Sequence, residues 1–325
     1  MSKKTVAVFH PGEMGAAIGA CLAARGAKVV WASDGRSAAT RARADSAGME
    51  DLRMIERALG AADVVVSVCP PHGALALARE VARRGFCGIY IDANAVSPET
   101  VRQAARAVEA AGAAFVDGGI IGPPPARAGT SRIYLTGSRS AEFAALFAGS
   151  NLEAIPLEGA AGAASALKAC YAAWTKGATA LLAAIRVLAQ HEGVEPALLA
   201  EWKLSQPGLD KRSEAVTVQA RKAWRWIGEM EEIAASFEAT GLPGGFSLAA
   251  AEIYRTLKAF KGSGEAPALP EVIAAIRQGA RKRKAASGVR RRSTRRIEEA
   301  PAKAKFKFGT GTGKIDPTKP HRFLK

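Results

Sequence analysis

The sequence predicts an α/β protein in which a doubly wound parallel sheet is followed by an all-helical domain and a disordered basic tail. Three observations support this prediction. Short apolar runs alternate with helical segments over the first half of the chain, as parallel strands and their crossover helices do. After about residue 157 only helical patterns continue, and beyond Gly279 the chain is basic and poor in apolar residues. The expected boundaries are therefore 1–157, 158–278 and 279–325.

The first strand and the turn after it are the most informative stretch of the chain. An apolar run at Thr5–Phe9 leads through a glycine-containing turn into an alanine-rich helical segment. Backbone N–H groups and the helix dipole converge at such a helix start, where they bind a pyrophosphate. Gly12 allows close approach of the backbone to the phosphates, and Gly15 allows the helix to pack on the strand. We therefore predict a dinucleotide-binding domain of the Rossmann type, with cofactor contacts from His10, Pro11, Gly12, Glu13, Met14 and Gly15.

Further strands and helices alternate after this first unit. Five more apolar runs are expected as strands, at Lys28–Ala32, Asp63–Val68, Gly88–Asp92, Ala113–Asp117 and Arg132–Thr136. Helices are expected between them, at residues 14–25, 37–47, 75–84, 98–111 and 141–148. Ser97 and Pro98 form a favourable helix start, because serine caps a helix and proline suits its first position.

The second domain begins with an unusually long helical pattern, from Gly159 to about Gly193. A helix of this length measures roughly 45 to 50 Å, so we expect it to span the junction between the two domains. Further helical stretches follow at Pro196–Leu204, Asp210–Ala239 and Ser247–Lys261. They predict an all-helical domain.

The charge of the chain is concentrated in its tail. The net charge of the 325 residues is +16, but residues 279–325 hold 16 of the 46 Lys and Arg and only 3 of the 30 acidic residues. The tail therefore contributes +13 and the preceding residues only +3. Binding of nucleic acid is expected through the tail alone, if at all, and the simpler interpretation is a solvated appendage.

Composition excludes several other classes. Four cysteines and four histidines are scattered along the chain without metal-ligand or disulfide spacing, so no metal site is expected. Charged residues interrupt every apolar window of about 20 residues, and Glu13 interrupts the apolar N-terminal stretch. We therefore expect neither a membrane span nor a secretory signal, and the expected location is the cytoplasm.

Three motifs in a consistent order resemble the β-hydroxyacid dehydrogenases, a superfamily that includes 3-hydroxyisobutyrate, threonate and 6-phosphogluconate dehydrogenases. Residues 159–168 (GAAGAASALK) resemble its glycine-rich helix entry and catalytic lysine. Residues 68–72 (VCPPH) resemble its loop after the fourth strand, and residues 117–122 (DGGIIG) its substrate loop. The similarity covers roughly residues 4–260. It is closest to a branch with a 6-phosphogluconate-dehydrogenase-like helical domain, as indicated by residues 121–125, 172–177 and 224–232.

The resemblance implies a function and a set of site residues. It implies hydride transfer between NAD(P) and a small hydroxy acid, with Lys168 as the general acid/base, and a homodimer. It also implies cofactor contacts from Cys69 and Pro70. The substrate contacts that it implies are Gly118, Gly119, Ile120, Ile121, Gly122 and Thr175.

Lys168 is unusual even apart from the resemblance. Its helical neighbours at i−4, i−3 and i+4 are Ala164, Ser165 and Ala172, which leave room for a ligand. Apolar surroundings would lower the pKa of the lysine and suit it to proton transfer. The alternative is a lysine that extends to solvent from an alanine-rich helix. Lys176, two turns later, is expected to be structural or at the rim of the site.

Two departures from the superfamily bear on the substrate. Ala172 stands where many members have asparagine, and Ile121 where they have serine. Loss of two polar groups predicts a changed substrate class, so an imine or ketone reductase or a non-catalytic dinucleotide sensor is an alternative. Asn94 is expected either to offer an amide near the nicotinamide or to form a turn at a strand end. Thr130 and Trp174 are expected either to line the pocket or to pack.

The choice of cofactor depends on the end of the second strand. Ser33 falls at the deciding position, and the nearby Arg36 favours the 2′-phosphate of NADP, whereas Asp34 favours NAD. We therefore predict NADP, with NAD possible. His10 replaces the usual first glycine of G-x-G-x-x-G, so an ordinary strand-to-helix turn is the alternative to a cofactor site.

Overall fold

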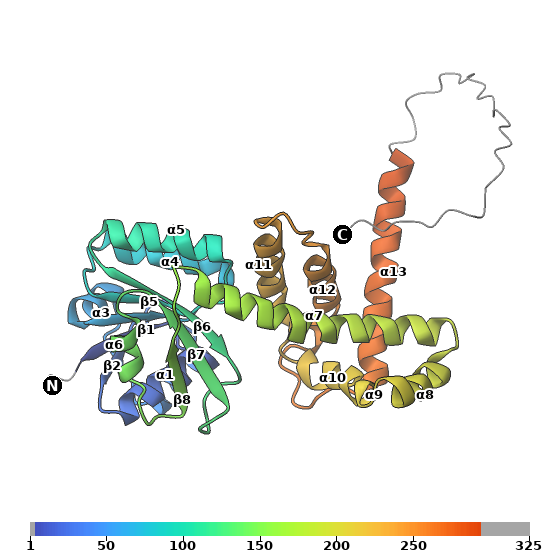
Figure 1. Ribbon diagram of the computed structural model, residues 1–325, viewed down its shortest axis with the longest axis horizontal. Helices are drawn as coiled ribbons and strands as arrows, with labels where there is room; N and C mark the ends of the chain where they lie inside the picture. Colours follow the sequence, from blue (N-terminus) through green and yellow to red (C-terminus); the bar gives the residue numbers. More distant parts are fainter. Residues whose placement is uncertain (1–3, 294–325) are drawn as a thin grey trace, which may run out of the picture. The chain divides into compact units, whose positions relative to one another are not determined.

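The computed structural model describes the backbone of residues 4–293 and the side chains of residues 4–283. It contains one eight-stranded sheet with the order β3-β2-β1-β4-β5-β6-β7-β8 (Figure 1). All neighbouring strands are parallel except β6 and β7. The strands are β1 Thr5–Phe9, β2 Lys28–Trp31, β3 Glu50–Asp51, β4 Val64–Ser67, β5 Ile89–Asp92, β6 Ala114–Ile121, β7 Ser131–Thr136 and β8 Leu152–Pro156. The predicted doubly wound sheet is confirmed.

Helices cover both faces of this sheet. They are α1 Glu13–Ala24, α2 Ala38–Ser46, α3 Ile55–Ala61, α4 Pro71–Arg83, α5 Pro98–Ala110 and α6 Ser140–Ala145. Alternation along β1 sets the two cores: Val6 and Val8 pack with α1, α2 and α6, whereas Ala7 and Phe9 pack with α3, α4 and α5. The side chain of Ser97 accepts a hydrogen bond from the backbone N–H of Thr100, as expected for the cap of α5.

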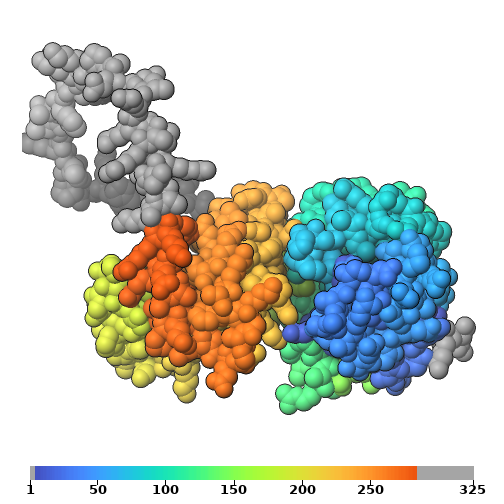
Figure 2. All heavy atoms as spheres, turned by 180° about the vertical axis from the view of Figure 1, so that it is seen from behind, coloured from blue at the N-terminus to red at the C-terminus, as the bar shows by residue number. Residues whose placement is uncertain are grey.

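The second region is helical, as predicted, and it joins the sheet region in one compact unit up to Ala280 (Figure 2). Its elements are α7 Ala163–His191, α8 Glu195–Ser205, α9 Leu209–Ser213, α10 Ala215–Ala220, η1 Ala223–Arg225, α11 Trp226–Glu238, α12 Gly245–Thr256, η2 Leu257–Phe260 and α13 Leu269–Ser293. Helix α7 runs from the sheet region, where it contacts β6, into the helical region, where it packs on α11 and α12. The expected junction helix is therefore present.

Several expected boundaries differ in the structure. Strands β3 and β8 and helix α3 were not expected, and the helix expected at 210–239 is divided into α9, α10, η1 and α11. Strand β6 continues to Ile121, so the motif expected as a substrate loop lies largely within a strand. Helix α13 includes residues 279–293, where disorder was expected. Residues 294–325, the rest of the expected tail, lie outside the described residues.

Candidate active site

A cleft of about 640 Å³ lies between the carboxyl ends of the parallel strands and the helical region. Twelve of the eighteen predicted site residues line it: His10, Gly12, Glu13, Met14, Gly15, Arg36, Cys69, Pro70, Asn94, Ile120, Gly122 and Lys168. The helical region contributes six further residues that sequence reasoning did not assign to the site: Lys176, Trp224, Arg225, Trp226, Gly228 and Glu229. This is the edge at which doubly wound sheets bind ligands.

The turn after β1 has the geometry of an anion site. His10 adopts a left-handed backbone conformation with φ of 62°, and the N–H of Gly12 donates to its carbonyl oxygen over 2.6 Å. Gly12 caps α1 without any side-chain hydrogen bond, so the N–H groups of the first helical turn have no side-chain partner there. A Cβ at Gly12 would lie 4.0 Å from its nearest neighbour, whereas at Gly15 it would lie 3.0 Å from the carbonyl oxygen of His10. The turn therefore leaves space for a pyrophosphate, and α1 packs tightly behind it.

Glu13 places a negative charge in the first turn of α1, and cations of the helical region neutralise it. Arg225 donates to its two carboxylate oxygens over 3.0 and 3.1 Å, and Lys222 lies 3.3 Å away. The hydrogen bond from Arg225 is the main cause that lowers the pKa of Glu13 to about 2. This contact joins the phosphate-binding turn to η1 and leaves the helix N-terminus free to attract an anion.

One histidine and two arginines, His10, Arg36 and Arg43, line the cleft near the end of β2. Arg36 Nη2 lies 3.5 Å from His10 Nε2, and burial followed by the charge of Arg36 lowers the pKa of His10 to about 4. Arg43 also lines the cleft, and its Nε donates to the carbonyl oxygen of Pro11 over 3.5 Å. Ser33 does not line the cleft: it is buried and accepts a hydrogen bond from Arg41 over 2.8 Å. Arg36 and Arg43 are therefore the cations available to a ligand here.

Asn94 is fully engaged in hydrogen bonds at the ends of β4 and β5. Its Nδ2 donates to Ser67 Oγ over 2.9 Å and to Asp92 Oδ1 over 2.8 Å, and its Oδ1 accepts from the N–H of Cys69 over 2.6 Å. It thus holds the loop before α4, and burial raises the pKa of the Cys69 thiol to about 12. Of the two expected roles, the geometry favours the structural one.

A buried carboxylate fixes the start of α7. Asp117 Oδ2 accepts hydrogen bonds from the N–H groups of Gly162 and Ser165 over 3.0 and 3.1 Å, and its Oδ1 accepts from Ser165 Oγ over 2.6 Å. Burial nevertheless raises the pKa of Asp117. The negative charge and the helix N-terminus stabilise each other, so this contact holds α7 against β6.

Gly119 brings Lys168 close to the sheet. A Cβ at this position would lie 2.3 Å from the carbonyl oxygen of Ala164 and 3.4 Å from Lys168 Cβ. Gly118 is similarly enclosed, with the carbonyl oxygen of Asp92 at 3.1 Å. Both glycines lie in β6 outside the cleft lining, because the strand continues through the motif and α7 covers it. Their place in the structure is a packing position beside the lysine.

Lys168 is the desolvated cation of the cleft. Burial is the largest influence on its pKa and lowers it. Glu229, Asp92 and Asp117 raise the pKa in opposition, and Lys176 lowers it further. Asp92 is itself fully buried, and burial raises its pKa to about 6. Burial thus lowers the pKa of Lys168 in the predicted direction, but its surroundings also include three carboxylates and a second lysine, which the sequence did not lead us to expect.

Lys176 forms an ion pair with Glu229 inside the cleft. Its Nζ contacts Glu229 Oε2 and lies 5.3 Å from the ring centroid of Trp226. The other carboxylate oxygen, Oε1, is buried and has no hydrogen-bond partner among the described residues. Lys176 was expected to be structural or at the rim of the site, and the structure places it in the cleft lining together with Lys168. The position of Glu229 in the cleft could not be predicted from the spacing along α7, because Glu229 lies on a different helix, α11.

The remaining predicted residues lie outside the cleft. Thr175 Oγ1 donates to the carbonyl oxygen of Tyr171 over 3.0 Å, and Thr130 Oγ1 donates to that of Arg127 over 2.7 Å. Trp174 is 63% exposed, and Ile121 ends β6 without lining the cleft. Pro11 contributes only its carbonyl oxygen, to Arg43.

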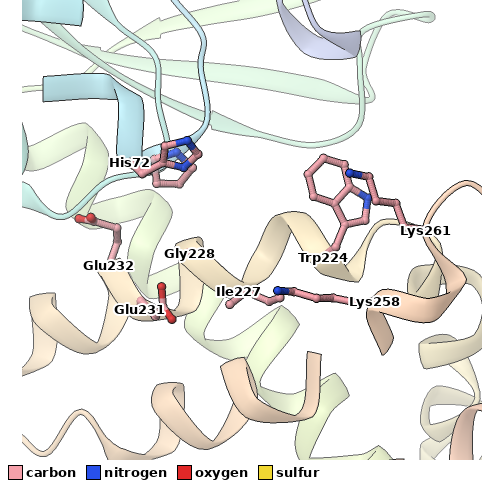
Figure 3. Close-up of a pocket in the computed structure, with 9 residues that line it drawn as sticks. His72, Trp224, Ile227, Gly228, Glu231, Glu232, Lys258 and Lys261 are labelled. Atoms are coloured by element: carbon pink, nitrogen blue, oxygen red, sulfur yellow. The ribbon is translucent and has the colours of Figure 1, made fainter. Parts of the chain in front are cut away.

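A second cavity of about 480 Å³ continues from the cleft and shares Pro71, His72, Trp224 and Gly228 with it. Figure 3 shows its remaining lining residues, Ile227, Glu231, Glu232, Lys258 and Lys261. Lys261 Nζ lies 4.1 Å from the ring centroid of Trp224. Glu232 is engaged by the N–H of Ser97, over 2.7 Å. The cavity extends the cleft along α11, and both acidic and basic side chains line it.

Comparison with known proteins agrees with this geometry. The model of the NAD binding domain of 6-phosphogluconate dehydrogenase matches residues 5–146. The match covers the sheet region, so this part of the chain is similar to the NAD-binding domain of that family. Residues 189–257 match a domain of unknown function, DUF1932. The family implies a dinucleotide cofactor, and the turn after β1 fits its phosphates. A search of curated proteins gives no match.

Solved structures place the fold among the hydroxyacid dehydrogenases. A conserved hypothetical protein from Sinorhizobium meliloti is 29% identical, with a TM-score of 0.62 over 85% of this chain and 96% of its own. A conserved protein of unknown function, described as structurally similar to 3-hydroxyacid dehydrogenases, is 27% identical, with a TM-score of 0.61 over 79% and 98%. The 3-hydroxyisobutyrate dehydrogenase of Mycobacterium tuberculosis shares the fold at 21% identity, with a TM-score of 0.64 over 85% and 99%.

Proposed function

We propose that this chain is an NAD(P)-dependent oxidoreductase that transfers a hydride between the nicotinamide and the carbinol or carbonyl carbon of a small hydroxy or keto acid. The observation that supports the proposal is the desolvated Lys168 in the same cleft as the phosphate-binding turn at residues 10–15. The bound dinucleotide would supply the hydride acceptor or donor.

Lys168 acts as the general acid and base in this proposal. In oxidation, its neutral amine accepts the proton of the substrate hydroxyl while the hydride leaves the adjacent carbon. In reduction, the ammonium returns that proton to the carbonyl oxygen. Desolvation lowers the pKa of Lys168, so both protonation states become accessible nearer to neutral pH. Asp117 positions the lysine through the start of α7.

NADP is the cofactor that the cleft favours. Arg36 and Arg43 line it where the 2′-phosphate of the adenosine ribose would lie, and Asp34 does not line it. The acidic Glu13 is neutralised by Arg225 and Lys222. Among the described residues that line this part of the cleft, none offers an unpaired carboxylate to the ribose 2′-hydroxyl of NAD.

The cleft around Lys168 supports two substrate classes. The ammonium group of Lys176 lines the cleft, and it could bind the carboxylate of a hydroxy acid if it exchanged its ion pair with Glu229 for the substrate. Ala93, Ala95 and Ile120 form an apolar wall, and Ala172, which stands where many superfamily members have asparagine, packs in the helical core. This wall supports a less polar ketone or imine as the second candidate substrate class.

Cofactor binding and turnover test the proposal separately. Fluorescence titration with NADPH and NADH should give binding, tighter for NADPH, that Gly12→Asp abolishes by repelling the phosphates without a clash. Turnover is then screened on small hydroxy acids, ketones and cyclic imines. Lys168→Ala should lower kcat/KM by about 10²- to 10⁴-fold and leave NADPH binding intact. The control is Lys203→Ala, an exposed lysine of α8.

Two results would contradict the proposal in different ways. Failure of both nucleotides to bind would show that His10 has disabled the phosphate turn. Tight binding with no turnover on any substrate, in wild-type protein and variants alike, would favour a non-catalytic dinucleotide sensor.

A further inference from the structure

The cavity along α11 has no role in the proposed hydride transfer as described so far. It measures about 480 Å³ and continues into the cleft at Pro71 and Trp224, which line both spaces. Figure 3 shows Lys258 and Lys261 on the same side of the cavity as Trp224, and the two acidic residues on the other side. A molecule that reacts in the cleft can therefore extend into a space that has a basic half.

The two acidic residues of this cavity are engaged by groups outside its lining. Glu231 forms an ion pair with Arg255 of α12. Glu232 Oε2 accepts hydrogen bonds from the N–H of Ser97 over 2.7 Å and from Thr100 Oγ1 over 3.2 Å, at the start of α5. The positive end of that helix stabilises the charge of Glu232. Neither carboxylate therefore needs a cation from within the cavity.

The two lysines of the cavity, by contrast, lack an anionic partner. Among the residues whose side chains the structure describes, none forms an ion pair with Lys258 of η2 or with Lys261, which follows η2. Lys261 Nζ lies 4.1 Å from the ring centroid of Trp224, a contact that leaves its N–H donors without an anion. Each ammonium group offers three donors. Together the two lysines form a site for an anionic group.

The charge balance of the lining favours one negative charge over two. With His72 neutral, the two lysines balance the two acidic residues, and Arg255, which pairs with Glu231, leaves one positive charge in excess. A single carboxylate matches that excess. A phosphate dianion would instead bring an unbalanced negative charge close to the two glutamates. We therefore expect the anionic group to be a carboxylate.

Apolar side chains line the passage between the cleft and the cavity. Pro71 and Trp224 border both spaces, and the buried Ile227 adds to the wall of the cavity. The Trp224 ring also contacts Arg225, at 5.3 Å from the ring centroid, and Arg225 is itself held by Glu13. Such a wall favours methylene groups or a ring over polar groups. The part of the ligand that precedes the carboxylate should therefore be apolar.

We propose that the cavity binds the distal carboxylate of an elongated substrate, a hydroxy or keto dicarboxylic acid whose second acid group is held by Lys258 and Lys261. This inference rests on the proposed function, because it places the reacting carbon beside Lys168. The dinucleotide is the competing occupant, since its phosphates are anions too. The turn at residues 10–15 and the two arginines near the end of β2 are already available to those phosphates, so we commit to the substrate.

Calorimetric titration tests the cavity without turnover. The probes are 2-oxoadipate, 2-oxopimelate and 2-oxosuberate, each compared with the 2-oxo monocarboxylic acid of the same chain length. They are titrated into Lys168→Ala protein saturated with NADPH, which lacks the proposed general acid. The best dicarboxylate should bind about 10- to 100-fold more tightly than its matched monoacid, because it gains charge-assisted contacts. Lys258→Met with Lys261→Met should abolish this preference, and Lys258→Arg with Lys261→Arg should retain most of it.

A matched control and steady-state kinetics complete the test. Lys203→Met with Lys211→Met removes two exposed lysines of α8 and α9 that line neither the cleft nor the cavity, and it should leave the preference in place. With Lys168 present, Lys258→Met and Lys261→Met together should act on the KM for the dicarboxylate rather than on kcat.

Three results would overturn the inference and leave the proposed function intact. They are equal affinity for the dicarboxylic and monocarboxylic acids, a preference that survives the removal of both lysines, and a loss of NADPH affinity in the lysine variant as large as its loss of dicarboxylate affinity. The last result would assign the lysines to the cofactor. A lysine-dependent preference in a protein that turns over no substrate would instead support the dicarboxylate site and contradict the proposed function.

Discussion

The two ends of the cleft are built in different ways. The cofactor end consists of one short segment, residues 10–15, whose backbone forms the anion site, with Arg36 and Arg43 close by in the sequence. The other end, which we propose to be catalytic and call the catalytic end, brings together Lys168 from α7, Glu229 from α11 and Asp117 from β6. Backbone geometry thus dominates one end, and side chains from distant elements dominate the other. Substitutions should therefore act locally at the first end and through packing at the second.

The largest contrast is expected between two glycines. Gly119→Ala would place its Cβ against the carbonyl oxygen of Ala164, so α7 and Lys168 must shift. We expect a loss of about 1 to 3 kcal/mol of stability and about a hundredfold loss of kcat. Gly12→Ala meets nothing closer than 4.0 Å and should leave stability nearly unchanged while it weakens NADPH binding. Urea denaturation with steady-state kinetics distinguishes them, and equal stability of the two variants would contradict the contrast.

The next effect concerns the arginines of the cofactor end. Arg36→Ala with Arg43→Ala removes two charge-assisted contacts to a 2′-phosphate, so the affinity for NADPH should fall by about 10- to 100-fold. The affinity for NADH should change little, because NADH lacks that phosphate. Titration with both nucleotides measures the ratio directly. An equal loss for both would mean that the arginines contact the shared phosphates or only support the turn.

A smaller effect, with opposite signs, is expected at the ion pair of the catalytic end. Lys176→Met removes a cation that lowers the pKa of Lys168, so the pH limb governed by Lys168 should move to higher pH. Glu229→Gln removes an anion that raises this pKa and leaves Lys176 unpaired, so the same limb should move to lower pH. Asp92 and Asp117 remain in both variants.

These shifts are measured as the pH dependence of kcat in Lys176→Met and in Glu229→Gln, with Glu231→Gln as the control variant. Glu231 lies on the same helix as Glu229 but pairs with Arg255, which makes it a matched control. Shifts of the same sign in Lys176→Met and Glu229→Gln would contradict the arrangement.

The smallest effect is expected for the contact between the two regions. Glu13 is about two-fifths exposed, so its ion pairs should contribute less than about 1 kcal/mol. Arg225 lowers its pKa to about 2 in the folded protein, so this stability is present above about pH 4.5 and is lost as the pH falls towards 2. Denaturation of wild-type protein and Glu13→Gln at pH 7 and pH 3 measures it. A difference that grows on acidification would refute this assignment.

The same contrast explains what could be predicted from the sequence. The residues of the first βα unit are contiguous, so their order alone indicated a strand, a phosphate turn and a helix, and the structure agrees. Glu229 could not be assigned to the cleft, because its approach to Lys168 depends on the packing of α11 against α7. The polar two-residue β3 has no apolar pattern to reveal it, since it lies at the edge of the sheet.

The start of α13 did carry a usable signal. Val272, Ile273 and Ile276 follow helical spacing and are buried, and Val272 and Ile276 belong to the core of the helical region. The basic run after Gly279 drew attention to charge, although a charged helix can continue from a packed one. The charge of the tail alone therefore misplaces the end of the helical region at Gly279, whereas the spacing of the apolar residues before Gly279 indicates helix α13.

The position of Gly119 has a practical consequence for anyone who would redesign this protein. Because β6 passes directly beneath the helix that bears the lysine, residues 117–119 have no freedom to vary without displacing the reacting group. Variation in a mutant library is better directed at Ala95, Ile120 and Trp226, which border the cleft. The scaffold thus separates a constrained layer, which sets where the proton is exchanged, from an adjustable wall, where new substrate scope can be selected.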